Sequence, residues 1–152
     1  MGRIVEALAE FDGRGESVFL AGGISGCPDW QREICTLLSE TSIVFLNPRR
    51  SHFSLEDASS APAQIEWEFR HLRIASAILF WFPAESLCPI ALYELGAWSM
   101  TEKSLFVGVD PDYARRSDIE IQTRLVRGET RIATSLAELA QQIVRSPLLN
   151  LR

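Results

Sequence analysis

Residues 77–82 (AILFWF) and 89–101 (PIALYELGAWSMT) decide how this chain folds, because they read as a buried strand followed by a nearly all-apolar helix. Six consecutive apolar residues are typical of a parallel strand that is covered on both faces. The helix carries one charged side chain, Glu94. Open α/β sheets place their chemistry just past the strand ends. Because burial of an unpaired carboxylate is costly, we expect Glu94 to be paired, hydrogen-bonded or functional.

The same alternation of strands and helices extends along the rest of the chain. The expected strands are 17–21, 42–46, 77–82, 105–109 and a short one at 131–133. The expected helices are 28–39, 64–75, 89–101, 118–127 and 135–145, the last with Ser135 as its cap and Glu138 three residues on. Residues 3–11 fit either a short strand or a helical turn, and residues 51–61 are expected to form a polar loop over the site. This order predicts one domain over residues 1–152, a flavodoxin-like, Rossmann-type three-layer α/β sandwich with a five-stranded, mainly parallel sheet.

Composition narrows the possible partners and locations. A protein that binds the nucleic acid backbone usually has a basic surface. Because the formal net charge is −5, we do not expect a nucleic acid partner. The three cysteines are an odd number without CxxC spacing, which predicts a reducing, cytoplasmic location with no disulfide and no zinc site. Cys88 is near a helix start, where the pKa of a thiol can fall, but it has no evident base partner and we expect it to be inert. There is no signal pattern and no apolar run of membrane-spanning length, so we expect no membrane partner.

The turn AGGISG (21–26) directly follows the first buried strand. Glycine lets the backbone approach a ligand, and the N–H groups at the start of the next helix can bind an anion or a hydroxyl. Its place at the carboxyl edge of the sheet favours ligand binding. A tight turn without any ligand is the alternative interpretation.

The helix expected at 64–75 carries an unusual carboxylate. Glu68 lies three residues from Ile65 and four from Leu72, so it falls within the apolar stripe that these two residues form with Phe69. It is either functional or a structural carboxylate that is bonded to a loop backbone or to an arginine. The helical phase places His71 on the outer surface, and no metal-binding pair of histidines is expected.

Three further residues near the strand ends are candidates for ligand contact. Asn47 can bind a ligand hydroxyl or satisfy the local turn before a proline. Arg49 can meet an anionic ligand or pair with Glu68 or Glu94. Trp81 can stack on a nucleobase or belong to the core.

Six segments carry a resemblance to a known family when they are taken together and in this order. They are FLAGGISG (19–26), NPRR (47–50), QIEWE (64–68), SAILFWF (76–82), YELG (93–96) and LFVGVDPDY (105–113). From about residue 18 to residue 139 the chain resembles the nucleoside 2-deoxyribosyltransferase family, and particularly its smaller deoxyribosyltransferase-like branch.

The resemblance implies a role for each candidate. Glu94 matches the nucleophile that attacks the anomeric carbon C1′ of the sugar, and Glu68 matches the family's acidic helix residue. The nucleophile must be ionised, and a second carboxyl with a raised pKa helps the leaving base to accept a proton. The remaining contacts to sugar, base or 5′-phosphate would come from Gly22, Gly23, Ile24, Asn47, Trp81, Glu85 and Ser86. No metal and no organic cofactor is implied.

The resemblance also implies a homo-oligomer, at least a dimer, in which the 89–101 helix with Trp98 and Met100 lies at the interface or in the interior. The first hypothesis is an enzyme that cleaves or exchanges N-glycosidic bonds of small-molecule nucleosides or nucleotides. The alternatives are a non-catalytic module that senses nucleotides on the same fold and a protein-interaction domain that binds through the 51–61 loop.

Overall fold

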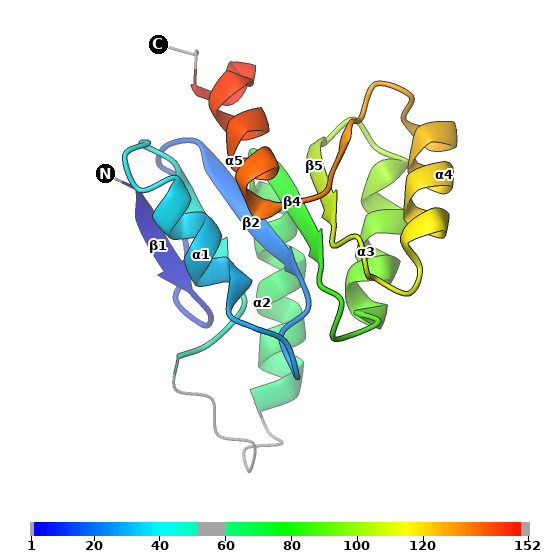
Figure 1. The fold of residues 1–152 in the computed structure, drawn as a ribbon. Helices are drawn as coiled ribbons and strands as arrows, with labels where there is room; N and C mark the ends of the chain where they lie inside the picture. The colour runs from blue at the N-terminus through cyan, green and yellow to red at the C-terminus, as the bar shows by residue number, and fades with distance from the viewer. Residues whose placement is uncertain (1, 52–59, 150–152) are drawn as a thin grey trace.

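A six-stranded, entirely parallel sheet between two layers of helices forms the centre of the protein (Figure 1). The computed structural model describes residues 2–51 and 60–149. The strands are β1 (Arg3–Glu6), β2 (Ser17–Gly22), β3 (Val44–Asn47), β4 (Ala77–Phe82), β5 (Ser104–Val109) and β6 (Ile132–Ala133). The helices are α1 (Trp30–Leu37), α2 (Ser60–Ile74), α3 (Pro89–Ser99), α4 (Arg116–Val126) and α5 (Leu136–Arg145), followed by a 3₁₀ turn at Pro147–Leu149.

The predicted flavodoxin-like, three-layer α/β fold is confirmed, but the sheet has six strands where we expected five. The additional strand is β1, from the 3–11 segment for which the sequence left strand and helical turn open. It pairs in parallel with β3 at the edge of the sheet, with Ile4 opposite Phe45. The predicted loop at 51–61 falls largely on residues 52–59, which lie outside the described residues, and its last two positions belong to α2.

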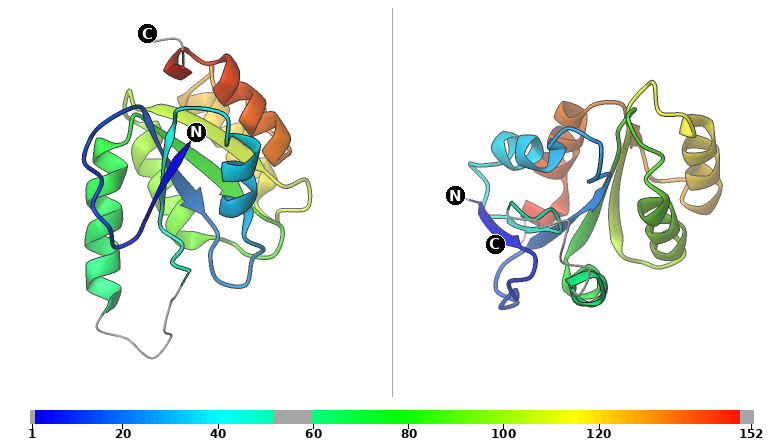
Figure 2. Two further views of the ribbon diagram at one scale, coloured as in Figure 1. Left: turned by 90° about the vertical axis from the view of Figure 1, so that its left-hand side faces the viewer. Right: turned by 90° about the horizontal axis from the view of Figure 1, so that it is seen from below.

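Alternation along β4 divides the core into two clusters, one on each face of the sheet. Ile78, Phe80 and Phe82 belong to the cluster that contains buried residues of α2, α3 and α4. Ala77, Leu79 and Trp81 belong to the cluster that contains buried residues of α1 and α5. Figure 2 shows the layers, with α1 and α5 on one side of the sheet and α2 and α3 on the other.

The strand order β1-β3-β2-β4-β5-β6 creates a switch point between β2 and β4. The chain leaves β2 toward β3 on one side and returns to β4 on the other side. The segments that follow β2 and β4, residues 23–29 and 83–88, therefore flank the crevice where ligands bind in open α/β sheets.

Hydrogen bonds explain where two helices begin. The Ser135 Oγ accepts from the N–H of Glu138 at 3.1 Å, as the cap predicted for α5 requires, and the Glu138 carboxylate accepts from the N–H of Thr134. Helix α1 begins at Trp30 and not at residue 28 as expected, because the carboxylate of Asp29 caps it by accepting from the N–H of Arg32.

The predicted apolar stripe of α2 is wrong at two of its three positions. Ile65 is 65% exposed and Phe69 is 60% exposed, while Leu72 is buried. The prediction that His71 lies on the surface is also wrong, because its exposed fraction is 0%. The buried side of α2 is therefore rotated from the side that apolar periodicity selected.

The segment after β1 explains this rotation, because it packs on α2 and needs polar partners there. The Trp67 Nε1 donates to the carbonyl of Ala9 at 2.7 Å, and the His71 Nε2 accepts from the N–H of Phe11 at 3.2 Å. The two rings stack with their centroids 4.0 Å apart. Since Nε2 accepts, the ring proton is on Nδ1, which lies 2.7 Å from the Trp67 carbonyl.

Helix α3 is less buried than its apolar composition predicts. Ala91, Leu95 and Ser99 are buried on one side, whereas Ile90 is exposed and Tyr93 is 77% exposed. Within residues 2–51 and 60–149, none of the helices combines the length and the apolar character that a membrane span requires.

Candidate active site

The structure brings together the two carboxylates that sequence analysis singled out. Glu68 is near the middle of α2 and Glu94 is near the middle of α3, and these helices lie side by side on one face of the sheet (Figure 2). Both side chains are half-buried. Glu68 is close enough to Glu94 for its charge to raise the pKa of the Glu94 carboxyl.

Burial is the main reason why the pKa values of both carboxyl groups are raised. Removal from water raises the pKa of Glu94, the nearby charge of Glu68 raises it further, and together they bring it to about 8. Burial also raises the pKa of Glu68, and a hydrogen bond from Gln64 opposes that rise. Near neutral pH the Glu94 carboxyl of the free protein is therefore mainly protonated, whereas sequence analysis expected this group to be ionised.

Gln64 is a member of the site that sequence reasoning missed. Its Nε2 donates to the carbonyl of Pro48 at 2.9 Å, and its amide also hydrogen-bonds to Glu68. Its Oε1 is buried and has no hydrogen-bond partner among the described residues. The signal was present in the sequence, since Gln64 and Glu68 are four residues apart on one helix and side chains at that spacing meet.

Packing accounts for the two glycines that begin the turn after β2. A Cβ on Gly22 would overlap the carbonyl of Trp81, and a Cβ on Gly23 would lie 2.7 Å from the Cys27 Sγ and 2.9 Å from the Cys88 Sγ. No side chain fits at either position without displacing a neighbour. The contact of Gly22, Gly23 and Ile24 with a ligand stays a prediction.

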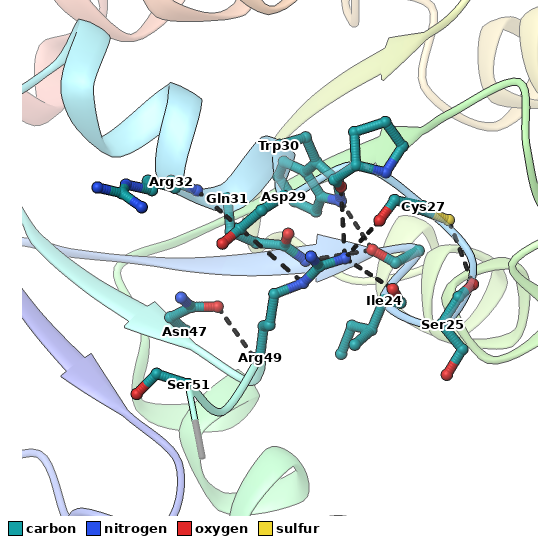
Figure 3. Close-up of polar contacts among 12 residues, drawn as sticks. Ile24, Ser25, Cys27, Asp29, Trp30, Gln31, Arg32, Asn47, Arg49 and Ser51 are labelled. Carbon is teal, nitrogen blue, oxygen red and sulfur yellow. Dashed lines mark hydrogen bonds and ion pairs between the residues drawn. The ribbon is translucent and has the colours of Figure 1, made fainter. Parts of the chain in front are cut away.

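Arg49 holds this turn from the side of β3 (Figure 3). Its Nη2 donates to the carbonyl of Ile24 at 2.7 Å and lies 3.3 Å from the carbonyls of Cys27 and Pro28. Its Nε is 3.8 Å from the carboxylate of Asp29. The guanidinium thus satisfies carbonyls of the turn, and no ion pair with either site carboxylate is found within the described part of the chain.

Asn47 and Trp81 each make contacts within the fold, and their contact with a ligand stays a prediction. The Asn47 Oδ1 accepts from the N–H of Arg49 at 3.0 Å, which is the local-turn interpretation of that residue. Trp81 is 6% exposed and packs in the cluster beneath α1 and α5, the layer opposite to the one that carries Glu68 and Glu94. The structure therefore does not bring the Trp81 ring to the carboxylate pair.

Two hydrogen bonds hold the end of the segment that leads into α3. The Ser86 Oγ accepts from the N–H of Cys88 at 3.2 Å, and Glu85 is exposed. The hydroxyl of Tyr113, a buried residue that sequence reasoning did not select, donates to the carbonyl of Leu87 at 2.7 Å. Burial raises the pKa of Cys88 to about 11, so the helix start does not activate this thiol.

A cavity of about 1020 Å³ lies elsewhere, at the opposite edge of the sheet. Its lining includes Glu16, Ser76 and Ser104, which are at the amino ends of strands or just before them, and neither site carboxylate. No group of three or more His, Cys, Asp or Glu side chains within residues 2–51 and 60–149 is arranged to hold a metal ion.

Comparison with protein families finds a match for most of the chain. Residues 15–113 match the family described as "nucleoside 2-deoxyribosyltransferase like". The matched range begins just before β2, ends at Tyr113 and includes both carboxylates. The comparison with curated proteins gave no match.

Proposed function

Because this chain belongs to the nucleoside 2-deoxyribosyltransferase-like family, we propose that it cleaves or exchanges the N-glycosidic bond of nucleosides or deoxynucleotides through a covalent glycosyl–Glu94 intermediate. The observation that carries the proposal is the pair of half-buried carboxylates, Glu68 and Glu94, on adjacent helices. Enzymes that cleave glycosidic bonds usually use two carboxyl groups whose pKa values are shifted by their surroundings.

The reaction proceeds in two displacements at C1′. A Glu94 carboxylate oxygen forms a bond to C1′ while the C1′–N bond breaks, and the electron pair of that bond leaves with the base, which takes a proton from Glu68. A second base or water then gives a proton to the Glu68 carboxylate as it bonds to C1′, and the C1′–O bond to Glu94 breaks and releases the Glu94 carboxylate. Attack by a base gives exchange, and attack by water gives hydrolysis.

The raised pKa of Glu94 restricts which protonation state of the free protein can react. Glu94 attacks only when it is ionised, yet its pKa is about 8. Repulsion between the two carboxylates opposes ionisation of both, so the reactive form has the proton on Glu68 and the charge on Glu94. Gln64 lies beside Glu68 and contributes to this balance, because its hydrogen bond favours the charged form of Glu68.

Substrate contacts are assigned to segments next to the pair. The turn that contains Gly22, Gly23 and Ile24 and the segment that contains Glu85 and Ser86 flank the switch point, where a sugar or phosphate is expected to bind. We place the nucleoside between this edge and the neighbouring helices α2 and α3. Arg49 and Asn47 then act on the substrate indirectly, by holding the turn.

We also propose that the protein forms a homo-oligomer through α2 and α3. Each helix presents a pair of large apolar side chains to solvent, Ile65 and Phe69 on α2 and Ile90 and Tyr93 on α3. Exposed apolar residues on neighbouring elements are typical of an interaction surface. A second copy that covers this layer would also cover the surface beside Glu68 and Glu94.

The test is to incubate the protein with each common 2′-deoxynucleoside and its 5′-monophosphate, with and without a second free base. Chromatography follows free base, free sugar and exchanged nucleoside, and mass spectrometry of rapidly quenched protein looks for a deoxyribosyl adduct on the peptide that contains Glu94. An adduct there supports the proposal. Tight nucleotide binding without adduct, sugar release or exchange would instead support the sensing module.

A further inference from the structure

We propose that Cys27 and Cys88 form an oxidisable thiol pair, which a small disulfide such as oxidised glutathione converts into an intramolecular disulfide across the switch point. The two sulfur atoms lie 2.7 and 2.9 Å from one and the same point, the position that a Cβ on Gly23 would occupy. Each thiol donates to a carbonyl two residues before it, Cys27 to Ser25 at 3.4 Å and Cys88 to Ser86 at 3.5 Å. Gly23 thus leaves room for two sulfurs to meet above the carboxyl edge of the sheet.

The fold keeps the two segments that carry these thiols in place. Arg49 binds three carbonyls of the turn that contains Cys27, and Tyr113 binds the carbonyl of Leu87, next to Cys88. Ser86 accepts from the N–H of Cys88, the residue just before α3. Closing a disulfide therefore needs little additional ordering of the chain, which favours the intramolecular product.

Differences in exposure give the two thiols separate roles. Cys27 is partly exposed and Cys88 is buried. The Cys27 thiolate attacks one sulfur of oxidised glutathione, forms a mixed disulfide and releases one glutathione thiolate. The Cys88 thiolate then attacks the Cys27 sulfur of the mixed disulfide and releases the second glutathione. The protein loses two hydrogen atoms, and one oxidised glutathione becomes two reduced glutathione molecules.

Protonation sets the speed of this exchange. Burial raises the pKa of both thiols, and the nearby charge of Glu85 raises them further. The thiolate is the attacking species, so the exchange is slow at pH 7 and accelerates as the pH is raised to 9. A thiol pair of this kind responds to a sustained change in redox conditions more than to a brief one.

Cys35 supplies the matched control. It is a buried cysteine of α1 that packs in the cluster with α5, away from the thiol pair. Oxidised glutathione should leave Cys35 unchanged in the wild type. The Cys35→Ser variant should still form the disulfide at the wild-type rate.

The experiment exposes the full chain to oxidised glutathione at pH 7 and pH 9 and follows it by intact mass and peptide mapping under non-reducing conditions. We expect the wild type to lose two hydrogen atoms and to yield one linked Cys27–Cys88 peptide. The Cys88→Ser variant should stop with one glutathionyl group on Cys27, and the Cys27→Ser variant should stay unmodified.

Three results would overturn the proposal: a stable glutathionyl adduct on the folded wild type, a disulfide that contains Cys35, or a disulfide between two chains. The intact mass and peptide map of the wild type test the proposal by themselves, even if a serine variant fails to fold. All readouts are masses and linkages, so they are independent of whether the protein acts on nucleosides.

Discussion

The two helical layers of this protein differ in how well their side chains follow apolar periodicity. On one face α5 places Leu136, Leu139 and Ile143 against the sheet, and its cap is the one that its sequence predicts. On the other face α2 and α3 bury His71 and partly bury two carboxylates, while Phe69 and Tyr93 are exposed. Local departures from pattern are expected at functional sites, and here they gather in the layer that carries the proposed chemistry.

The largest effect should come from Glu94. Replacing it by Gln removes the nucleophile, so turnover should fall by roughly 10³-fold or more. The matched control is Glu102→Gln, an exposed carboxylate just beyond α3, which should leave turnover unchanged. Initial rates of base release and base exchange check this. Turnover at the wild-type rate in the Glu94 variant would contradict the proposal that the α2–α3 layer carries the nucleophile.

Glu68→Gln should lower turnover by roughly 10²-fold, as expected for loss of a general acid. The matched control is Glu66→Gln, an exposed carboxylate on the same helix. Loss of the Glu68 charge also removes one of the two causes that raise the pKa of Glu94. The variant keeps only Glu94 to titrate, at a lower pKa, so kcat/KM should no longer fall above pH 8, a change that a merely structural role for Glu68 would not produce.

The wild-type pH profile is the third test. The reactive form is the pair with one proton, on Glu68, and one charge, on Glu94, so kcat/KM should be level just below pH 8 and should fall up to about tenfold per pH unit above it, where the pair loses that proton. A profile that stays level from pH 8 to pH 10 would show that the reaction does not need the proton of this pair. Rates with one deoxynucleoside in overlapping buffers are sufficient.

Glu94 should also make stability depend on pH. Folding raises the pKa of this group from 4.5 to about 8, so between these values the folded state binds more protons than the unfolded state. The unfolding free energy must then fall as the pH rises through this window. Relative to the wild type, Glu94→Gln should gain about 1–2 kcal/mol of unfolding free energy between pH 5 and pH 8, allowing for solvent screening of a partly exposed side chain. Urea unfolding at both pH values measures the difference.

The smallest effect on the fold should come from exposed apolar residues. Phe69→Glu on α2 should change the stability of the isolated chain by less than about 0.5 kcal/mol, yet it should dissociate an oligomer that forms through this layer. The matched control is Val144→Glu, at an exposed valine of α5 on the opposite layer. Light scattering coupled to size-exclusion chromatography distinguishes the two. Equal masses for both variants and the wild type would place the interface elsewhere.

Much of the architecture was predictable because it depends on local signals. Uninterrupted apolar runs mark β2 and β4 as strands covered on both faces, and Ser135 with Glu138 marks the start of α5. The alternation of these elements is sufficient for a parallel sheet between two helical layers. Glu94 stood out for an equally local reason, since it is the one charge in an apolar helix.

Tertiary contacts decided what periodicity could not. Which side of α2 is buried depends on Ala9 and Phe11, whose backbone groups require Trp67 and His71 as partners. The pKa of Glu94 depends on how deeply it is buried and on Glu68, a residue that only the fold brings near. The meeting of Cys27 with Cys88 is likewise a result of strand order. The spacing of residues along the chain predicts which side chains lie on the same face of one helix or strand. Which neighbours that face contacts depends on how elements that are distant in the sequence pack together.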